Sequence, residues 1–338
     1  MTALSIVIPC YDEEDCLDEL FRRVTAVAQS VAGDDHDIVL VNDGSKDATW
    51  GVMQRLAGVD HRIVAINLSR NHGHQLALTA GLDLARGDHI LILDADLQDP
   101  PELLPDMMAT MRAEAADVVY AVRRARAGEG FAKKASAALF YRLLARLTDT
   151  DIPLDTGDFR LMSRRALDAF LALPEQARFI RGMVAWIGFR QVPFAYDRAE
   201  RHAGATNYPF TKMLRLAFDA ITGFSTAPLR FASHAGLALT GASVLLMAYI
   251  GLGWLRGTTV QGWTSLMLVV VGLGAVQMFV LGMIGEYLGR LYIEAKKRPL
   301  YIVADIIGTA REGSRLGHRA DTSATSETPG GIGTRPTK

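Results

Sequence analysis

The sequence has few cysteines and no excess of charge of either sign. Its 338 residues include two cysteines, and 36 basic residues nearly balance 37 acidic ones, for a formal net charge of -1. Cys10 and Cys16 lie close together in a stretch with a strand-turn-helix pattern, which favours reduced thiols in a cytosolic environment over a disulfide framework. The balanced charge offers no general attraction for nucleic acid, so we expect no nucleic-acid partner.

Two signals are missing from the start of the chain. The segment Met1 to Cys10 leads directly into a strand-like pattern, without the basic start and apolar stretch of a signal peptide. No Gly-x-Gly-x-x-Gly follows this first predicted strand, which argues against a dinucleotide-dependent oxidoreductase. The sequence therefore predicts neither export nor hydride-transfer chemistry.

Charged residues are absent from two long stretches nearer the C-terminus. Phe231 to Leu255 and Trp263 to Gly285 contain no Asp, Glu, Lys or Arg. At a rise of about 1.5 Å per residue, each would form a helix of about 35 Å, enough to cross a hydrocarbon core of about 30 Å. Buried helices of a soluble domain are the alternative, but such helices seldom stay free of charge for so long. We predict a transmembrane hairpin over residues 231–289, with spans at about 231–255 and 263–287.

The charges beside these stretches predict their orientation. Basic residues precede the first stretch and follow the second: Lys212, Arg215, Arg230, Arg290, Lys296, Lys297 and Arg298. The link between the stretches, Arg256 to Gly262, holds a single charge. By the positive-inside rule, both outer flanks face the cytoplasm, and so does the large N-terminal part of the chain.

The N-terminal part alternates short β-branched runs with stretches of helical periodicity. The expected strands are Ser5–Pro9, Asp37–Val41, Arg62–Leu68, His89–Leu93 and Asp117–Val122, and the expected helices between them are Glu13–Val31, Lys46–Ala57 and Gln75–Arg86. This alternation predicts an α/β domain with a largely parallel sheet covered on both faces. Ligands of such sheets bind beyond the carboxyl ends of the strands.

The rest of the chain divides by composition. The globular domain is expected to cover residues 1–207, with further helices at Gly130–Thr148 and Ser163–Leu171 and a strand at Phe189–Tyr196. Residues 208–230 mix basic, aromatic and aliphatic side chains, which is typical of interfacial helices. Residues 290–312 are predicted to run along the cytoplasmic surface, and residues 313–338, rich in Gly, Ser, Thr and Pro, to form a disordered tail.

Polar clusters follow four successive predicted strands. They are Pro9–Glu14, Asn42–Asp47, Ser69–His74 and Asp94–Asp99. Because the carboxyl ends of parallel strands meet at one edge of a sheet, we expect these clusters to converge. Turn and cap formation alone would account for Asn42 to Ser45, so a functional role for that cluster depends on its neighbours.

The last of these clusters has the composition of a metal site. Asp94 and Asp96 supply carboxylates two residues apart, and Gln98 adds a carbonyl oxygen. Such an oxygen-rich set suits Mg²⁺ or Mn²⁺, which would also hold a diphosphate. A capped loop before the helix at Pro100 is the alternative, and it accounts for Asp99 but not for Asp94 or Asp96.

Five segments of the chain resemble the family 2 inverting glycosyltransferases with a GT-A fold. They are Ile8–Glu14 (IPCYDEE), Val41–Ser45 (VNDGS), Leu68–Asn71 (LSRN), Asp94–Pro101 (DADLQDPP) and Gly157–Arg164 (GDFRLMSR). More narrowly, the chain is similar to bactoprenol (undecaprenyl-phosphate) glucosyltransferases and, more distantly, to dolichyl-phosphate mannose synthases. The resemblance runs from about residue 3 to 303 and includes Ile284–Arg290 (IGEYLGR). It implies a Rossmann-like, mainly parallel GT-A catalytic domain followed by two transmembrane helices.

Carried over position by position, the resemblance implies a role for each matching residue. The nucleotide would contact Pro9, Tyr11, Glu13, Asp43, Arg70 and Asp94, and the metal and diphosphate would contact Asp94, Asp96 and Gln98. The acceptor phosphate would meet Arg123, Arg126 and Lys134, and the residues implied in catalysis are Asp96, Asp155, Asp158 and Arg201. Arg201 would close over the phosphates, whereas Asp155 and Asp158 would either do chemistry near the sugar or only orient their turn. For Arg123 and Arg126, a solvated basic face is the alternative.

The implied activity is the inverting transfer of a hexose to undecaprenyl or another polyprenyl phosphate, with Mg²⁺ or Mn²⁺ as cofactor. UDP-glucose is the donor that the resemblance favours, while mannose, galactose, N-acetylglucosamine and aminoarabinose remain open. The resemblance also implies a multi-pass protein of the bacterial inner membrane and a homo-oligomer, namely a tetramer. A processive polysaccharide synthase would carry a Gln-x-x-Arg-Trp motif and more spans, and a non-catalytic scaffold would not need Asp94, Asp96 and Gln98 intact.

The sequence departs from the family pattern at Asn207, and three further residues lie at variable or unusual positions. Asn207 stands where relatives often have lysine, so a phosphate contact there is in doubt. His72 and His74 flank Gly73 and suit either a metal or, with the aspartates available, a role in sugar contact or loop packing. Cys10 lies in a turn and is not expected to act in catalysis.

Overall fold

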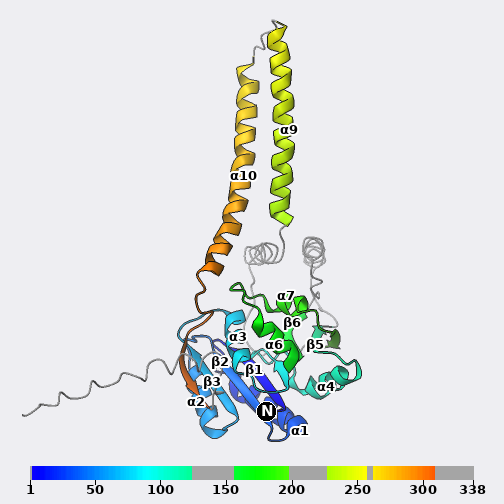
Figure 1. The fold of residues 1–338 in the computed structure, drawn as a ribbon. Coiled ribbons are helices and arrows are strands. Elements are labelled where there is room, and N and C mark those ends of the chain that lie inside the picture. Colours follow the sequence, from blue (N-terminus) through cyan, green and yellow to red (C-terminus); the bar gives the residue numbers. More distant parts are fainter. Residues whose placement is uncertain (1, 124–155, 198–226, 257–261, 309–338) are drawn as a thin grey trace, which may run out of the picture.

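The computed structural model describes residues 2–123, 156–197, 227–256 and 262–308 (Figure 1). The α/β part consists of β1 (Leu4–Cys10), α1 (Leu17–Ala32), β2 (His36–Asn42), α2 (Thr49–Val59), β3 (Ile63–Leu68), α3 (His74–Leu84), β4 (His89–Ile92), η1 (Pro101–Leu103), α4 (Leu104–Ala113), β5 (Val118–Arg123), β6 (Thr156–Ser163), α6 (Arg164–Ala172), α7 (Ile180–Trp186) and β7 (Gln191–Tyr196). Two long helices, α9 (Ala227–Leu255) and α10 (Trp263–Ala295), and a last strand, β8 (Val303–Ile307), follow. The expected helix at 130–148, the interfacial segment and the C-terminal tail lie outside the described residues.

Within the described residues, eight strands form one mixed sheet in the order β7-β5-β6-β4-β1-β2-β3-β8. The strands β4, β1, β2 and β3 are parallel, which confirms the prediction for the centre of the sheet. Strand β6 runs antiparallel to β4 and β5, and β8 runs antiparallel to β3. Because β2 and β4 lie on opposite sides of β1, the switch point at which ligands bind in such sheets falls beside β1.

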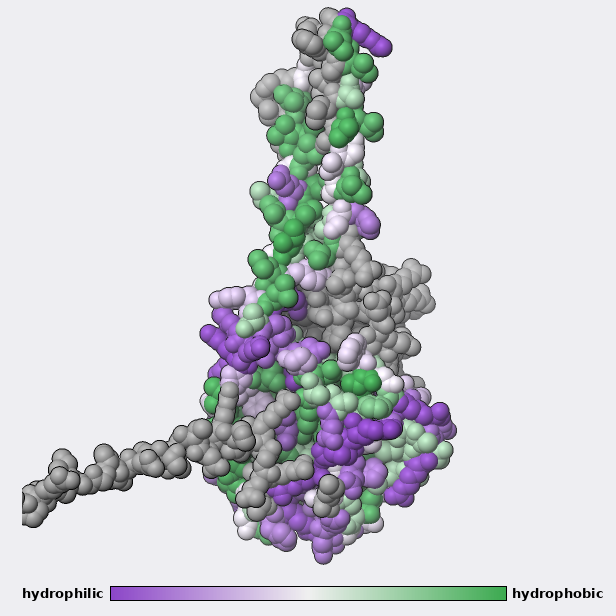
Figure 2. All heavy atoms as spheres, in the orientation of Figure 1, coloured by the Kyte–Doolittle hydropathy of each residue, from purple (hydrophilic) through white to green (hydrophobic). Residues whose placement is uncertain are grey.

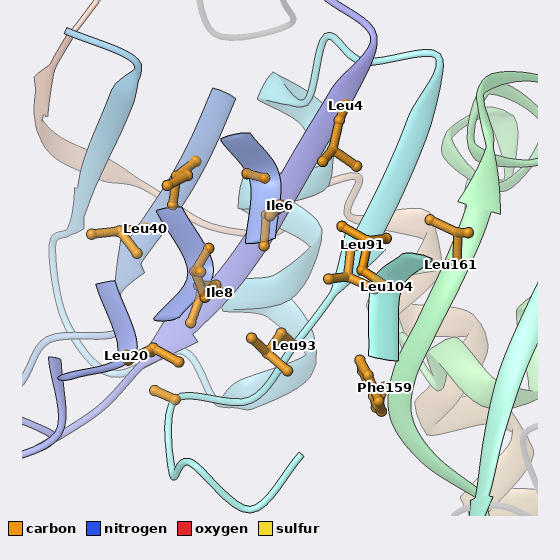
Figure 3. Close-up of a cluster of buried hydrophobic side chains, with 14 of the residues drawn as sticks. Leu4, Ile6, Ile8, Leu20, Leu40, Leu91, Leu93, Leu104, Phe159 and Leu161 are labelled. Carbon is orange, nitrogen blue, oxygen red and sulfur yellow. The ribbon is translucent and has the colours of Figure 1, made fainter. Parts of the chain in front are cut away.

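Both faces of the central strands are buried. On one face, Ile6 and Ile8 of β1 belong to a cluster with Leu20 of α1 (Figure 3). On the other face, α3 approaches so closely that a Cβ on Gly81 would lie 2.4 Å from Val7 Cγ1. Burial of each large aliphatic side chain contributes about 1.5–3 kcal/mol, so this packing gives the site a rigid base.

The sequence does not predict β6, although this strand pairs with both β4 and β5. Its charged residues favour a turn, but Asp158 and Arg160 are each only 3% exposed in the structure. Their charges compensate one another within the fold, which a pattern of polar residues cannot reveal. The predicted helix at 163–171 is confirmed as α6, where Ser163 Oγ accepts a hydrogen bond from Ala166 N (3.2 Å) at the N-cap.

Helices α9 and α10 lie side by side and extend away from the α/β domain (Figure 1). Hydrophobic residues cover most of this hairpin, whereas hydrophilic residues gather on the α/β domain (Figure 2). Within α10, Gly272–Ala295 is long and apolar enough to cross a membrane, and none of its most apolar window is buried. It is the one such helix found among the described residues, so the first predicted span, over α9, stays a prediction.

The chain returns from α10 to the edge of the sheet. The sequence predicts a surface segment here, but α10 continues to Ala295 and β8 then pairs with β3. Tyr301 Oη donates a hydrogen bond to Asp83 Oδ2 (2.6 Å), and Ser69 N donates one to Ile302 O (2.9 Å). The strand escapes prediction because it is short and contains Asp305, whose carboxylate accepts a hydrogen bond from Asn67 Nδ2. Since β8 starts beside the end of β3, the root of the hairpin lies near the carboxyl edge of the sheet.

Candidate active site

The loops that follow the four parallel strands contact one another at the carboxyl edge of the sheet. Asp12 N donates a hydrogen bond to Ser45 Oγ (3.0 Å), which joins the loops after β1 and β2. Asp43, after β2, accepts hydrogen bonds from the loop after β3, and His74 Nε2 lies 3.6 Å from Asp94 Oδ1, after β4. The convergence predicted from the sequence is therefore confirmed.

The end of β1 and the loop after it carry three of the predicted nucleotide residues. Pro9 is buried within the strand, in register with Val41, whereas the Tyr11 side chain is 41% exposed. Glu13 N donates a hydrogen bond to Thr49 Oγ1 (2.9 Å), which ties the loop to the start of α2. The exposed ring of Tyr11 is thus able to stack on a flat ligand such as a base.

Asp43 holds the loop that contains Arg70. Its two carboxylate oxygens accept hydrogen bonds from His72 N (2.7 Å) and Gly73 N (2.9 Å). Burial raises the pKa of Asp43, although these two hydrogen bonds act in the opposite direction. Gly44 has a left-handed φ of 67°, and a Cβ there would lie 2.5 Å from Arg70 C. A carboxylate oxygen can accept more than one hydrogen bond, so Asp43 retains capacity for a nucleoside.

The loop after β4 presents the predicted metal ligands. Asp94 Oδ1 is buried and, among the residues that the structure describes, has no hydrogen-bond donor. Burial raises the pKa of Asp94 to about 6, although nearby His74 acts in the opposite direction. Asp96 Oδ1 accepts a hydrogen bond from Gln98 N (3.1 Å) across Leu97, whose φ is 60°. A cation near Asp94 would relieve the cost of burying this carboxylate.

The donor set fits a hard divalent cation held in part by its substrate. Two carboxylates and one amide oxygen suit Mg²⁺ or Mn²⁺, which often binds through one or two carboxylates and the phosphates of a ligand. No cluster of three or more His, Cys, Asp or Glu side chains suited to a metal occurs in the described ranges. With three oxygen donors, Asp94, Asp96 and Gln98 fit a metal ion that shares its coordination with the oxygens of a diphosphate.

Asp158 lies beside this loop and is held by several donors. Its carboxylate, 4% exposed, accepts hydrogen bonds from Arg181 Nε (2.9 Å), His74 Nε2 (3.1 Å) and Gln75 Nε2 (3.2 Å). Burial alone would raise the pKa of Asp158, but His74 and the charges of Arg181 and Arg160 hold it well below its usual range. A carboxylate so firmly ionised is a poor proton acceptor, which favours a positioning role over chemistry.

Sequence reasoning missed part of this arrangement. It gives no role to Arg181 or Gln75, because α7 is not predicted and neither residue belongs to a motif. Gln75 also accepts a hydrogen bond from Ile180 N (2.9 Å), which links the start of α3 to α7. The sequence presents His74 only as one of a pair with His72, and its position between Asp94 and Asp158 becomes visible in the fold.

The structure places the other predicted residues only in part. Arg70 is exposed and donates a hydrogen bond to Asn71 O (3.3 Å). Arg123 ends β5, in register with Tyr196 of β7. The remaining candidates, Asp155, Arg126, Lys134 and Arg201, lie outside the described residues.

Comparison with known proteins identifies the family. Residues 5–171 match the family described as glycosyl transferase family 2. The uncharacterized glycosyltransferase YkcC of Bacillus subtilis (strain 168) is 47% identical over 90% of this chain and 94% of its own length. This chain belongs to glycosyl transferase family 2. Its mixed sheet with a parallel centre agrees with the GT-A fold expected for this family.

Two further relatives of this family 2 glycosyltransferase have more specific names. The prophage bactoprenol glucosyl transferase homolog of Escherichia coli (strain K12) is 38% identical over 89% of this chain and 98% of its own length. The bactoprenol glucosyl transferase of Shigella phage SfV is 39% identical over 89% of this chain and 97% of its own length. Among solved structures, mannosyl-3-phosphoglycerate synthase from Rubrobacter xylanophilus aligns with a TM-score of 0.44 at 20% identity, over 65% of this chain and 72% of that one.

Proposed function

We propose that this glycosyltransferase transfers a hexose, in our first choice glucose from UDP-glucose, to undecaprenyl or another polyprenyl phosphate. The observation that carries the proposal is the length of the similarity to the bactoprenol glucosyl transferases. It covers 301 residues, more than the α/β domain before the hairpin contains, so it extends into the long helices. A shared hairpin is expected if the relatives share a lipid acceptor.

The donor side of the site is built from the loops after the parallel strands. Tyr11, Glu13, Asp43 and Arg70 would bind the nucleoside, with Tyr11 offering an exposed ring. Asp94, Asp96 and Gln98 would hold Mg²⁺ or Mn²⁺ with the donor diphosphate. When bound, the metal would neutralise charge on the departing nucleoside diphosphate.

The acceptor side needs no strong base. A phosphate monoester has a second pKa of about 6 and is largely dianionic at neutral pH, so it supplies its own nucleophilic oxygen. This agrees with the low pKa of Asp158, which stays ionised and paired. Arg123, Arg126, Lys134 and Arg201 are the residues proposed to bind phosphate oxygens. In-line attack would invert the anomeric centre.

The hairpin suits such an acceptor. We place both α9 and α10 across the bacterial inner membrane, with the α/β domain in the cytoplasm, because basic residues flank the outer ends of the two apolar stretches. The antiparallel return of β8 supports this arrangement, because it puts the hairpin root on the side of the sheet where the site lies. A lipid phosphate at the membrane surface would then be near the site.

A donor screen tests the proposal. The full chain in detergent micelles would be mixed with undecaprenyl phosphate, Mn²⁺ and one of UDP-glucose, UDP-galactose, UDP-N-acetylglucosamine or GDP-mannose. Mass spectrometry is expected to show one hexose added to the lipid, and NMR an anomeric configuration opposite to that of the donor. Failure with every donor would overturn the lipid assignment, and repeated addition of sugars would favour a processive synthase.

A further inference from the structure

His74 stands between two carboxylates that come from different parts of the fold. It is the first residue of α3, and its Nε2 lies 3.1 Å from Asp158 Oδ2 on β6 and 3.6 Å from Asp94 Oδ1 after β4. A carboxylate accepts hydrogen bonds, so the contact with Asp158 requires the hydrogen on Nε2. One ring nitrogen therefore connects the proposed metal loop to the buried acid of the other half of the sheet.

The two contacts of His74 are unequal. Asp158 also accepts hydrogen bonds from Gln75 and Arg181, so its position is fixed by neighbours on both α3 and α7. Asp94 Oδ1 is buried, and the described residues offer it no hydrogen bond. The Nε2 atom of His74 is thus held firmly by Asp158 and lies beside Asp94 Oδ1. It limits the directions in which the Asp94 carboxylate can turn.

We propose that His74 is a positioning residue, which Asp158 anchors and which orients the Asp94 carboxylate toward the divalent metal of the metal–nucleotide complex. This inference rests on the proposed function, because it requires that Asp94 takes part in metal binding. Residues behind a metal ligand fix the ligand's orientation, and their loss typically lowers metal affinity about 10- to 100-fold. In this arrangement Asp158 acts on the metal only through His74.

A purely structural role for His74 makes a different prediction. If the ring only packed the start of α3, its loss would lower stability and weaken UDP binding with or without metal. A positioning role affects the metal-dependent part of binding alone. The two roles are therefore separated by measuring UDP affinity in EDTA and Mn²⁺ affinity in the presence of UDP.

The experiment uses the full chain in detergent with three single variants. Free Mn²⁺ would be followed by electron paramagnetic resonance during titration with UDP present, and UDP affinity in EDTA by calorimetry. His74→Ala is expected to weaken Mn²⁺ binding about 10- to 100-fold with UDP affinity in EDTA unchanged. His74→Gln, whose amide nitrogen replaces Nε2, is expected to restore most of the affinity. His61→Gln, at an exposed loop position, is the matched control and should bind like the wild type.

Coupling to Asp158 is tested with a double variant. Asp158→Asn is expected to weaken Mn²⁺ binding as well, because the ring loses its anchor, and adding His74→Ala should then cost little more. If the losses of Mn²⁺ affinity in the two single variants simply add in the double variant, Asp158 and His74 act independently, and the proposed coupling is wrong. If His74→Ala does not fold, the comparison of His74→Gln with His74→Asn replaces it, since the shorter amide does not reach the Nε2 position.

The outcomes separate the inference from the function on which it rests. Unchanged Mn²⁺ affinity in His74→Ala, or equal affinities in His74→Gln and His74→Asn, would overturn the role of His74. Absence of Mn²⁺ and UDP binding in the wild-type protein would instead overturn the proposed metal-dependent activity. Loss of UDP binding in EDTA would show that the ring serves structure only.

Discussion

The two halves of the sheet carry the candidate site in different ways. In the half made of β4, β1, β2 and β3, the polar residues occupy loops directly after strands. In the half made of β6, β5 and β7, Asp158 lies within a strand, and its partner Arg181 lies within α7. The first half offers groups to a ligand, whereas the second holds a charged pair in place. We therefore expect substitutions of the ligand-facing groups in the first half to affect binding and transfer most, and loss of the Asp158–Arg181 pair in the second half to lower stability most.

The largest expected effect belongs to the first half. Asp96→Ala removes a proposed metal ligand, and loss of several kcal/mol of charge stabilisation corresponds to a fall in transfer of about a thousandfold or more. Transfer of radiolabelled glucose to undecaprenyl phosphate would measure it. Asp106→Ala, at an exposed position of α4, is the matched control and should keep full activity. Full activity of Asp96→Ala would show that the metal assignment is wrong.

The second half should respond to loss of its charged pair. Arg181→Ala leaves Asp158 buried with fewer donors and is expected to lower the free energy of unfolding by about 2–3 kcal/mol, less than for a fully buried pair, since the arginine is 36% exposed. Urea unfolding of the detergent-solubilised protein would measure the loss. Arg181→Lys keeps the charge but not the two-point contact and should recover part of it.

An exposed pair serves as the reference for this prediction. Arg22 and Glu19 lie on the surface of α1, with side chains 69% and 44% exposed. Arg22→Ala should leave the unfolding curve unchanged, because water screens such a pair. Equal urea-unfolding curves for Arg181→Ala and Arg22→Ala would contradict the proposal that the charged pair in the second half of the sheet stabilises the fold.

Gly44 tests whether the loops of the first half depend on one another. Gly44→Ala places a Cβ 2.5 Å from Arg70 C at a left-handed φ, which costs about 1–2 kcal/mol and displaces the loop that Asp43 holds. UDP affinity is expected to fall, as calorimetry would show. Gly51→Ala in α2, where nothing lies within 4 Å of the added Cβ, should bind UDP normally and be slightly more stable. Normal UDP binding by Gly44→Ala would indicate that the loop tolerates the shift.

The same contrast explains how much the sequence could predict. The parallel strands and the four clusters after them follow from β-branched runs that end in polar residues, so the edge at which Asp43 and Asp94 converge is predictable. Arg181 was not, because its partner lies 23 positions away and the pair becomes visible only when β6 and α7 are packed together. Strand β8 was missed because its pairing with β3 depends on the chain returning from α10.

The smallest effect concerns this returning strand, which joins the hairpin to the first half of the sheet. Tyr301→Phe removes the hydrogen bond from Tyr301 Oη to Asp83 and is expected to lower the free energy of unfolding by about 1 kcal/mol. Tyr249→Phe, whose ring is 68% exposed on α9, is the matched control and should change nothing. If both variants unfold like the wild type, the contact between Tyr301 and α3 adds no stability. A loss confined to Tyr301→Phe would show that residues after the hairpin stabilise the catalytic domain, so that the hairpin is fastened to the sheet beside the site.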